Sequence, residues 1–274
     1  MDQHTESFGS PPAGGFRGHS RLQDLFSSQS KKVLNIYCTA GYPKPDSTVA
    51  VLQALQEGGA DIIEIGMPYS DPLADGEVIQ ASSAVALQNG MTITRLFEQL
   101  SGIRGSIHVP LILMGYLNPV MQFGIENFCA KAKEVGIDGI ILPDLPMYEY
   151  ETQYKALFES QGLDMIFLVT PETSEERIRK IDALGSGFIY AVSSSSTTGK
   201  NKPVEAQEDY FKKLHDMQLK NPVLVGFGIW DQQSFEAASQ YTNGAIIGSA
   251  YIKVLENAGD IAAATKEFLK NIIR

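Results

Sequence analysis

The sequence has little cysteine and no long apolar run, and both absences narrow its class. Only Cys38 and Cys129 occur in 274 residues, each within an apolar periodic segment, which excludes a disulfide framework and predicts buried free thiols in a reducing compartment. No segment approaches the roughly 18 consecutive apolar residues of a membrane span. The first residues lack the apolar centre of a signal peptide. We therefore expect a cytoplasmic protein that does not enter a membrane.

Positive charge is also scarce. Lys and Arg number 22 against 32 Asp and Glu, which gives a formal net charge of -10 at pH 7. Such a surface repels polyanions, so neither nucleic acid nor an anionic membrane is expected as a partner. A small anion would therefore have to bind through local donors.

The residues that serve three common kinds of catalysis are missing. The four histidines, which include His108 and His215, show no metal-ligand spacing, so no metal site is predicted. No lysine falls inside a predicted strand, which removes the usual Schiff-base nucleophile, and Lys200 and Lys253 are interpreted as solvent-facing charges. No G-x-G-x-x-G motif lies in a βαβ context, which argues against a nicotinamide cofactor. If this chain cleaves a carbon-carbon bond, the substrate itself must therefore accept the electron pair of the broken bond.

The chain divides into a short tail and a repeating unit. Residues 1–19 are polar, contain several Gly and Pro residues and have no period, so we expect a disordered or expression-derived tail. From residue 20 onward, short apolar runs alternate with amphipathic segments. About eight runs are found: VLNIYC from Val33, DIIEIG from Asp61, VPLILM from Val109, GIILPD from Gly139, DMIFLV from Asp164, GFIYAV from Gly187, PVLVGF from Pro222 and GAIIGS from Gly244.

This alternation predicts parallel strands joined by helical crossovers. Residues 20–274 are expected to form one α/β domain, a (β/α)8 TIM barrel with a short N-terminal helix and extra short helices, and an open doubly wound sheet is the alternative. Glycines at the breaks, as in the segments from Glu57, Glu134, Leu184 and Tyr241, are expected to cap the C-termini of helices. In such barrels the chemistry lies on the loops after the carboxyl ends of the strands.

A carboxylate interrupts the second apolar run at that end. Glu64 shares a face with Ile62, and if this face points into the barrel, desolvation raises the pKa of Glu64 toward that of a general acid or base. The alternative is a strand-end Glu paired with a surface Lys or Arg. The loop YSDPLADG, from Tyr69 to Gly76, follows directly, and by itself it predicts only a turn and a helix cap.

Three glycine-containing loops follow the last three predicted strands. They are SSSSTTGK from Ser193, VGFGI from Val225 and IGSA from Ile247. Barrel phosphate sites lie after strands seven and eight with a helix N-terminus nearby, and glycine lets backbone amides approach an anion. Each glycine alone is more often structural, but three in register predict a phosphate site.

Several long segments together resemble one family, the alpha chain of tryptophan synthase. They are EGGADIIEIGMPYSDPLADGEVIQ, GYLNPVMQFGIENFCAKAKEVGIDGIILPDLP, IYAVSSSSTTG, VGFGI and IIGSAYIK, and the resemblance runs from about Leu22 to the C-terminus. It implies a barrel without a cofactor that cleaves indole-3-glycerol phosphate to indole and D-glyceraldehyde 3-phosphate by a retro-aldol reaction. It also implies a pyridoxal-phosphate-dependent beta chain as partner in an alpha2beta2 heterotetramer, which receives the indole for L-tryptophan synthesis.

The resemblance assigns site residues position by position. Glu64 in EIGMP matches the catalytic glutamate of the family, and Asp75 in PLADG matches its catalytic aspartate. Thr198 matches a threonine that closes the sixth loop over the site, and Tyr190 lies near the catalytic glutamate. The implied phosphate site is Gly199, Gly228, Gly248 and Ser249, and the implied indole pocket is Tyr37, Met114, Tyr116, Ile141, Phe227 and Ile246. Without the resemblance, most of the apolar residues would be interpreted as core.

The chain departs from the family pattern at a few positions. Ser194 and Ser196 stand where the family often has arginine and glycine, and Tyr37 stands where it usually has phenylalanine. These differences bear on the motion of the sixth loop and on the polarity of the indole pocket rather than on the reaction. Competing functions are a stand-alone indole-releasing lyase, another phosphate-binding barrel lyase or isomerase, and a noncatalytic alpha-like subunit that activates a beta chain through Asp71–Gly76.

Overall fold

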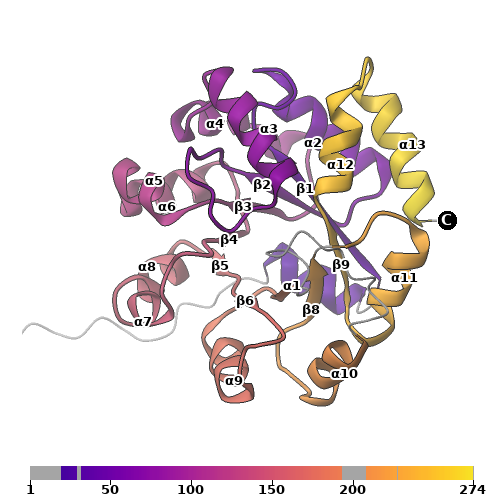
Figure 1. Cartoon of the computed structure of the whole chain (residues 1–274). Coiled ribbons are helices and arrows are strands. Elements are labelled where there is room, and N and C mark those ends of the chain that lie inside the picture. The colour runs from indigo at the N-terminus through magenta and orange to yellow at the C-terminus, as the bar shows by residue number, and fades with distance from the viewer. Residues whose placement is uncertain (1–19, 30–31, 193–207, 227, 274) are drawn as a thin grey trace, which may run out of the picture.

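A computed structural model describes residues 20–29, 32–192, 208–226 and 228–273. These residues contain nine strands (Figure 1): β1 (Val33–Thr39), β2 (Ile62–Gly66), β3 (Leu111–Met114), β4 (Gly139–Ile141), β5 (Asp164–Met165), β6 (Leu168–Val169), β7 (Ile189–Val192), β8 (Val223–Gly226) and β9 (Gly244–Ile247). The expected tail, residues 1–19, lies outside the described residues.

Helices surround the strands in Figure 1. They are α1 (Arg21–Ser28), α2 (Ser47–Gly58), α3 (Glu77–Gln88), α4 (Ile93–Leu100), α5 (Leu117–Phe123), α6 (Ile125–Glu134), α7 (Met147–Glu149), α8 (Lys155–Ser160), α9 (Glu175–Leu184), α10 (Glu208–Asp216), α11 (Gln232–Tyr241), α12 (Ser249–Glu256) and α13 (Ile261–Ile273). A short 3-10 turn, η1 (Ile103–Gly105), and a π-helical turn, η2 (Tyr150–Tyr154), complete the described elements. No described helix is both long enough and apolar enough to cross a membrane.

All strand pairs are parallel, and the sheet curls into a barrel. The strand order is β5-β4-β3-β2-β1-β9-β8-β7-β6, so the two ends of the sheet, β5 and β6, are halves of one predicted strand. Between them, Ile166 donates its amide to Ile140 and Phe167 accepts from Tyr190, both at 3.0 Å. This run therefore bonds to both neighbours and closes the sheet. The predicted (β/α)8 barrel is confirmed, with its fifth strand broken where the run changes partner.

The interior of the barrel is filled by side chains that alternate along the strands. On β2, Ile62 belongs to the interior cluster, whereas Ile63 and Ile65 pack under the surrounding helices. Glu64 lies two residues beyond Ile62 and points the same way, as predicted. The interior cluster consists of Leu22, Val33, Ile62, Ile112, Ile141, Ile166, Phe188, Tyr190, Val192, Leu224 and Ile246.

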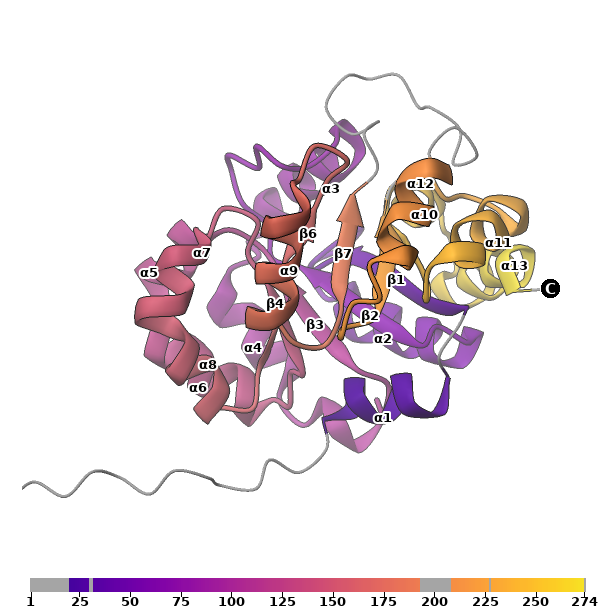
Figure 2. The ribbon, with the colours of Figure 1, turned by 90° about the horizontal axis from the view of Figure 1, so that it is seen from below.

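The short N-terminal helix that the sequence predicts closes the base of the barrel. Figure 2 shows α1 at the end opposite to the tip of the β7 arrow. Ser20 caps α1 in a capping box with Gln23, and Leu22 is fully buried in the interior cluster. Arg21 donates to Asp138 at 2.8 Å, which ties α1 to the loop before β4. The barrel is therefore sealed at its amino-terminal end and open only at the other.

Glycines end helices at three of the four segments that were predicted to do so. Gly59, with φ 98°, ends α2, and Gly136, with φ 81°, follows α6, so both take the left-handed conformation that glycine favours. Gly185 ends α9 in an extended conformation, with φ -79°. The expectation is wrong at the fourth segment, because Thr242 ends α11.

Candidate active site

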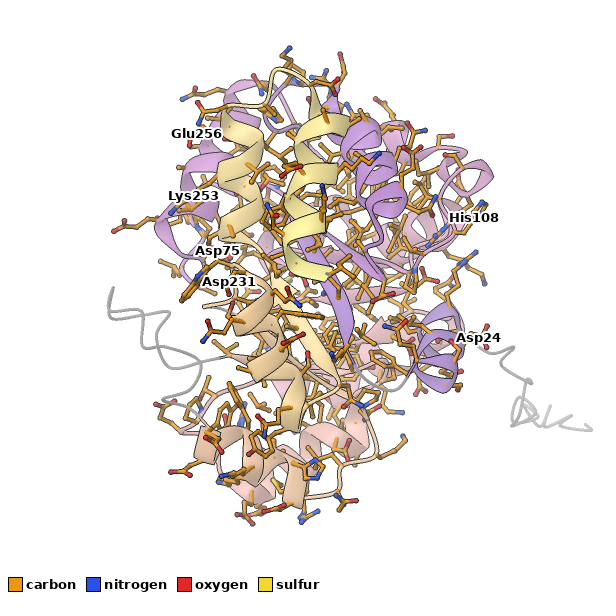
Figure 3. The ribbon with its side chains drawn as sticks, turned by 90° about the vertical axis from the view of Figure 1, so that its right-hand side faces the viewer. Asp24, Asp75, His108, Asp231, Lys253 and Glu256 are labelled. Carbon is orange, nitrogen blue, oxygen red and sulfur yellow. The ribbon has the colours of Figure 1, made fainter. Side chains whose placement is uncertain are left out.

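A cavity of about 910 Å³ opens at the carboxyl ends of the strands. Strand residues form its floor, and α3, α12 and the segment after β8 form its walls. In Figure 3, Asp75 and Lys253 lie on one side of the molecule and His108 on the opposite side. The lining residues are Tyr37, Glu64, Asp75, Gly76, Glu77, Val78, Ile79, Gln80, Met114, Tyr190, Gly228, Ile229, Trp230, Ile246, Gly248, Ser249, Ala250, Lys253 and Phe268.

Glu64 is a desolvated carboxyl at the floor of this cavity. Its side chain is 1% exposed, and its Oε2 accepts a hydrogen bond from the amide nitrogen of Asn35 at 3.0 Å. Oε1 has no hydrogen-bond partner among the described residues. Burial raises the pKa of Glu64 to about 8. The hydrogen bond from Asn35 lowers this pKa, and the charge of Asp75 raises it by a smaller amount. The side chain is therefore protonated at neutral pH and can donate a proton.

Asp75 is held at the cavity by Tyr116. The Tyr116 hydroxyl donates to Asp75 Oδ2 and accepts from the amide of Ala74, both at 3.0 Å. Loss of hydration raises the pKa of Asp75 to about 6, although the bond from Tyr116 favours the charged form. Asp75 is therefore ionised at neutral pH while Glu64 is not. One proton donor and one carboxylate thus face the same cavity.

Two tyrosine rings fit the barrel mouth only because glycines lie beside them. A Cβ at Gly66 would lie 1.9 Å from the hydroxyl oxygen of Tyr37, and a Cβ at Gly226 would lie 2.3 Å from the Tyr190 ring. The Tyr37 hydroxyl accepts a bond from Thr39 Oγ1 at 3.4 Å. Tyr37, which departs from the family pattern, therefore adds a polar atom to the wall without reaching Glu64 by a described hydrogen bond.

Part of the cavity wall is built from backbone. Gly248 and Ser249 line the cavity where α12 begins, and the first amides of a helix have no partner within it. Gly228 adds a backbone segment with φ 76°, a left-handed conformation that favours glycine. Amide donors at a helix N-terminus bind anions such as phosphate. The predicted phosphate residues Gly228, Gly248 and Ser249 thus lie together in the structure.

Lys253 belongs to the cavity, although the sequence indicated a solvent-facing charge. It is exposed, yet it is the one basic residue among the described lining residues. Lys253 follows Ser249 by four positions on α12, so both lie on one helix face. That spacing is the signal that could have placed it near the anion site. The sequence did not indicate Asn35, which contacts Glu64, or Trp230, which lines the cavity, as site residues.

The other predicted site residues have different positions. Ile141 does not line the cavity; it is fully buried in the interior cluster, where it pairs with Met114 in the register of β3 and β4. Tyr116 contacts Asp75 and is not a lining residue. Thr198, Gly199 and Phe227 lie outside the described residues, as do the departures at Ser194 and Ser196. No group of three or more His, Cys, Asp or Glu in the described part of the chain could hold a metal ion.

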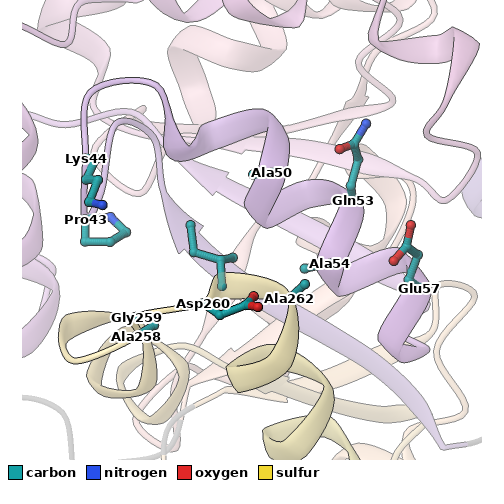
Figure 4. A pocket seen from close by; sticks show the side chains of 11 residues that line it. Pro43, Lys44, Ala50, Gln53, Ala54, Glu57, Ala258, Gly259, Asp260 and Ala262 are labelled. Atoms are coloured by element: carbon teal, nitrogen blue, oxygen red, sulfur yellow. The ribbon is translucent and has the colours of Figure 1, made fainter.

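A second, smaller hollow of about 330 Å³ lies on the outer surface, between α2 and the turn that joins α12 to α13. Figure 4 shows Lys44, Glu57 and Asp260 around it. Its walls contain no strand residue, and no described contact in it joins an acid to a base. The cavity that holds Glu64 and Asp75 is therefore the candidate active site.

Comparisons with known proteins place the chain in one family. The family model described as tryptophan synthase alpha chain matches residues 24–272. A tryptophan synthase alpha chain from Flavobacterium psychrophilum is 54% identical over 232 residues, 84% of this chain and 92% of the relative. One from Bacteroides thetaiotaomicron is 51% identical over 242 residues, 88% of this chain and 94% of the relative.

Solved structures give the same result. The crystal structure of tryptophan synthase subunit alpha from Legionella pneumophila has a TM-score of 0.84 at 32% identity and covers 93% of this chain and 97% of that one. A chain of tryptophan synthase from M. tuberculosis has a TM-score of 0.81 at 31% identity, covering 93% of this chain and all of that one. With barrel, cavity and sequence in agreement, the chain belongs to the tryptophan synthase alpha chain family.

Proposed function

We propose that this chain is a lyase that cleaves indole-3-glycerol phosphate into indole and D-glyceraldehyde 3-phosphate, the alpha reaction of tryptophan synthase. One observation carries the proposal: Glu64 and Asp75 line the same cavity, which the first residues of α12 also line. Burial gives the two acids different protonation states near pH 7. The cavity therefore offers an acid, a carboxylate and an anion site to one ligand.

In the reaction, Glu64 gives one proton to the substrate and takes another from it. Protonated Glu64 donates to C3 of the indole ring, which gives a ring cation with an N-H group. Ionised Asp75 accepts a hydrogen bond from this N-H and stabilises the positive charge. The Glu64 carboxylate then takes the proton of the neighbouring side-chain hydroxyl. The bond between C3 and the side chain breaks, its electron pair returns to the ring, and the hydroxyl carbon becomes the aldehyde.

The remaining lining residues bind and orient the substrate in this proposal. Tyr37, Met114, Tyr190 and Ile246 supply the wall for the indole ring. Gly228, Gly248 and Ser249 donate backbone amides to the phosphate, and Lys253 adds the positive charge that an acidic chain otherwise lacks there. Thr198, Gly199, Phe227, Tyr116 and Ile141 stay predictions for the same site.

We further propose that the chain works with a tryptophan synthase beta chain in an alpha2beta2 heterotetramer, in the cytoplasm. Pyridoxal phosphate would belong to the beta chain, and this chain would need no cofactor of its own. Residues 20–274 would form the catalytic domain. The family implies the partner, and the tetramer, the compartment and the domain limits remain proposals.

An assay of the isolated chain with and without a beta chain tests the function. We expect slow release of indole from indole-3-glycerol phosphate, with a rate that rises at least about tenfold when the beta chain is added. Fast release by the isolated chain with no increase would favour a stand-alone lyase. Binding to the beta chain without any cleavage would mean a noncatalytic subunit.

Substitutions at Gly248 test the anion site. A Cβ there would lie 3.5 Å from both Ile79 Cδ1 and Tyr37 Cβ, an ordinary contact, so Gly248→Ala should bind substrate nearly as the wild type does. Gly248→Asp places a negative charge beside the phosphate and should raise KM on the order of 100-fold. Gly248→Asn separates the effect of bulk from that of charge. A wild-type KM in Gly248→Asp would place the phosphate elsewhere.

A further inference from the structure

Asn35 is a polar side chain in a mostly apolar, fully buried strand. All seven residues of β1 are buried, and Asn35 is 0% exposed. A buried amide without partners destabilises the fold, so its hydrogen bond should reveal its role. The one described side-chain bond of Asn35 runs from its amide nitrogen to Glu64 Oε2, at 3.0 Å. Its Oδ1 has no partner among the described residues.

Asn35 reaches Glu64 from beneath the cavity. In the register between β1 and β2, Tyr37 lies opposite Glu64 and Asn35 lies opposite Ile62. Asn35 is therefore one inward-facing position closer to the base of the barrel. Tyr37 and Glu64 line the cavity, whereas Asn35 does not. Its effect on a ligand would therefore have to pass through Glu64.

Four ionisable groups surround Glu64, and of these Asp75 is the one whose charge disfavours a negative charge on Glu64. Asp75 faces it from the loop after β2, Tyr37 and Cys38 from β1, and Tyr190 from β7. Asn35 is the group whose hydrogen bond lowers the pKa of Glu64. A donor of this kind binds a carboxylate more strongly than a neutral acid.

We propose that Asn35 is the positioning residue of Glu64: its amide holds Oε2 and leaves Oε1 as the oxygen that gives and receives the substrate proton. This inference rests on the proposed lyase function. Fixing one oxygen removes rotation of the carboxyl group, and the bond to Asn35 strengthens when Glu64 loses its proton. Asn35 thereby stabilises the charge that forms during the reaction.

The test replaces the amide by an apolar group of similar size, in Asn35→Leu. We expect kcat to fall about 10- to 100-fold, because a hydrogen bond to a charged group is lost, with KM changed less than about threefold. The alkaline limb of the kcat profile should move to higher pH. Infrared difference titration should show the same shift for the Glu64 carboxyl, whose band is assigned with Glu64→Gln.

Two further variants separate positioning from a merely structural role. Asn35→Asp keeps the shape but places a second acid beside Glu64, so the Glu64 titration should move further upward than in Asn35→Leu. Thr265→Val removes another buried hydrogen bond, the 2.8 Å contact with the Tyr251 hydroxyl, which lies away from the cavity. It should lower Tm and leave kcat and the Glu64 titration unchanged.

The inference is overturned if Asn35→Leu and Asn35→Asp change Tm but keep the wild-type kcat and Glu64 titration. Failure of the proposed function would look different, because the wild type itself would release no indole. The infrared titration needs no turnover, so it reports on the link between Asn35 and Glu64 in either case. If Asn35→Leu does not fold, Asn35→Asp carries the same comparison.

Discussion

Replacing Glu64 by glutamine is expected to reduce kcat by about 10³-fold, or ~4 kcal/mol in activation free energy, with KM nearly unchanged. The glutamine side chain keeps the size of glutamate, and its carbonyl oxygen can still accept the bond from Asn35. It has no acidic proton to give to the indole ring. Steady-state kinetics of indole release, together with binding of a nonreactive substrate analogue, measure the two effects separately.

The neighbouring acid Glu77 provides the matched control. It lines the same cavity from the first turn of α3 but is exposed, so Glu77→Gln should change kcat only slightly. The wild-type profile should also lose activity as pH rises through about 8, because the protonated form of Glu64 is the active one. Glu64→Gln should lack this limb. An equal loss of turnover and analogue binding would instead mean that Glu64 is structural.

Replacing Asp75 by asparagine is expected to reduce kcat by about 10²- to 10³-fold. The change keeps an oxygen that can accept the bond from Tyr116, so the loop should keep its place, but it removes the negative charge that stabilises the ring cation. The wild-type activity should fall below about pH 6, where Asp75 takes up a proton, and this acid limb should vanish in the variant. Kinetics across pH 5 to 9 measure both effects.

Two variants show whether the charge of Asp75 or its placement matters. Tyr116→Phe removes the hydroxyl that holds Asp75 and should lower kcat by about tenfold, less than Asp75→Asn does. Asp71→Asn removes an exposed acid of the same loop that does not line the cavity, and the isolated chain should keep its activity. Equal losses in Asp75→Asn and Asp71→Asn would remove Asp75 from the mechanism.

The fold and the direction of the Glu64 side chain could be predicted because they depend on local patterns. Alternation along β2 placed Glu64 on the face of Ile62, and strict repetition of strands and helices predicted a closed parallel barrel. The glycine caps at Gly59 and Gly136 followed from the same local chemistry. The resemblance, rather than the pattern, assigned Asp75 its role.

The missed features depend on register and on long-range packing. Asn35 and Glu64 meet only because β1 and β2 align as they do, and a single sequence does not contain that alignment. The break in the fifth strand arises where one run must bond to two neighbours to close the sheet. Lys253 could have been found from its spacing to Ser249, but only once α12 is known to begin at the cavity.

Because α1 covers the base of the barrel, the barrel is closed at its amino-terminal end. Leu22 and other residues of the interior cluster are buried between α1 and the level of Glu64. A ligand seated in the mouth then isolates the acid from bulk water. In the proposed reaction, the proton that Glu64 gives to the ring carbon would be replaced by the hydroxyl proton of the same substrate molecule, so Glu64 would regain its acid form without taking a proton from bulk water.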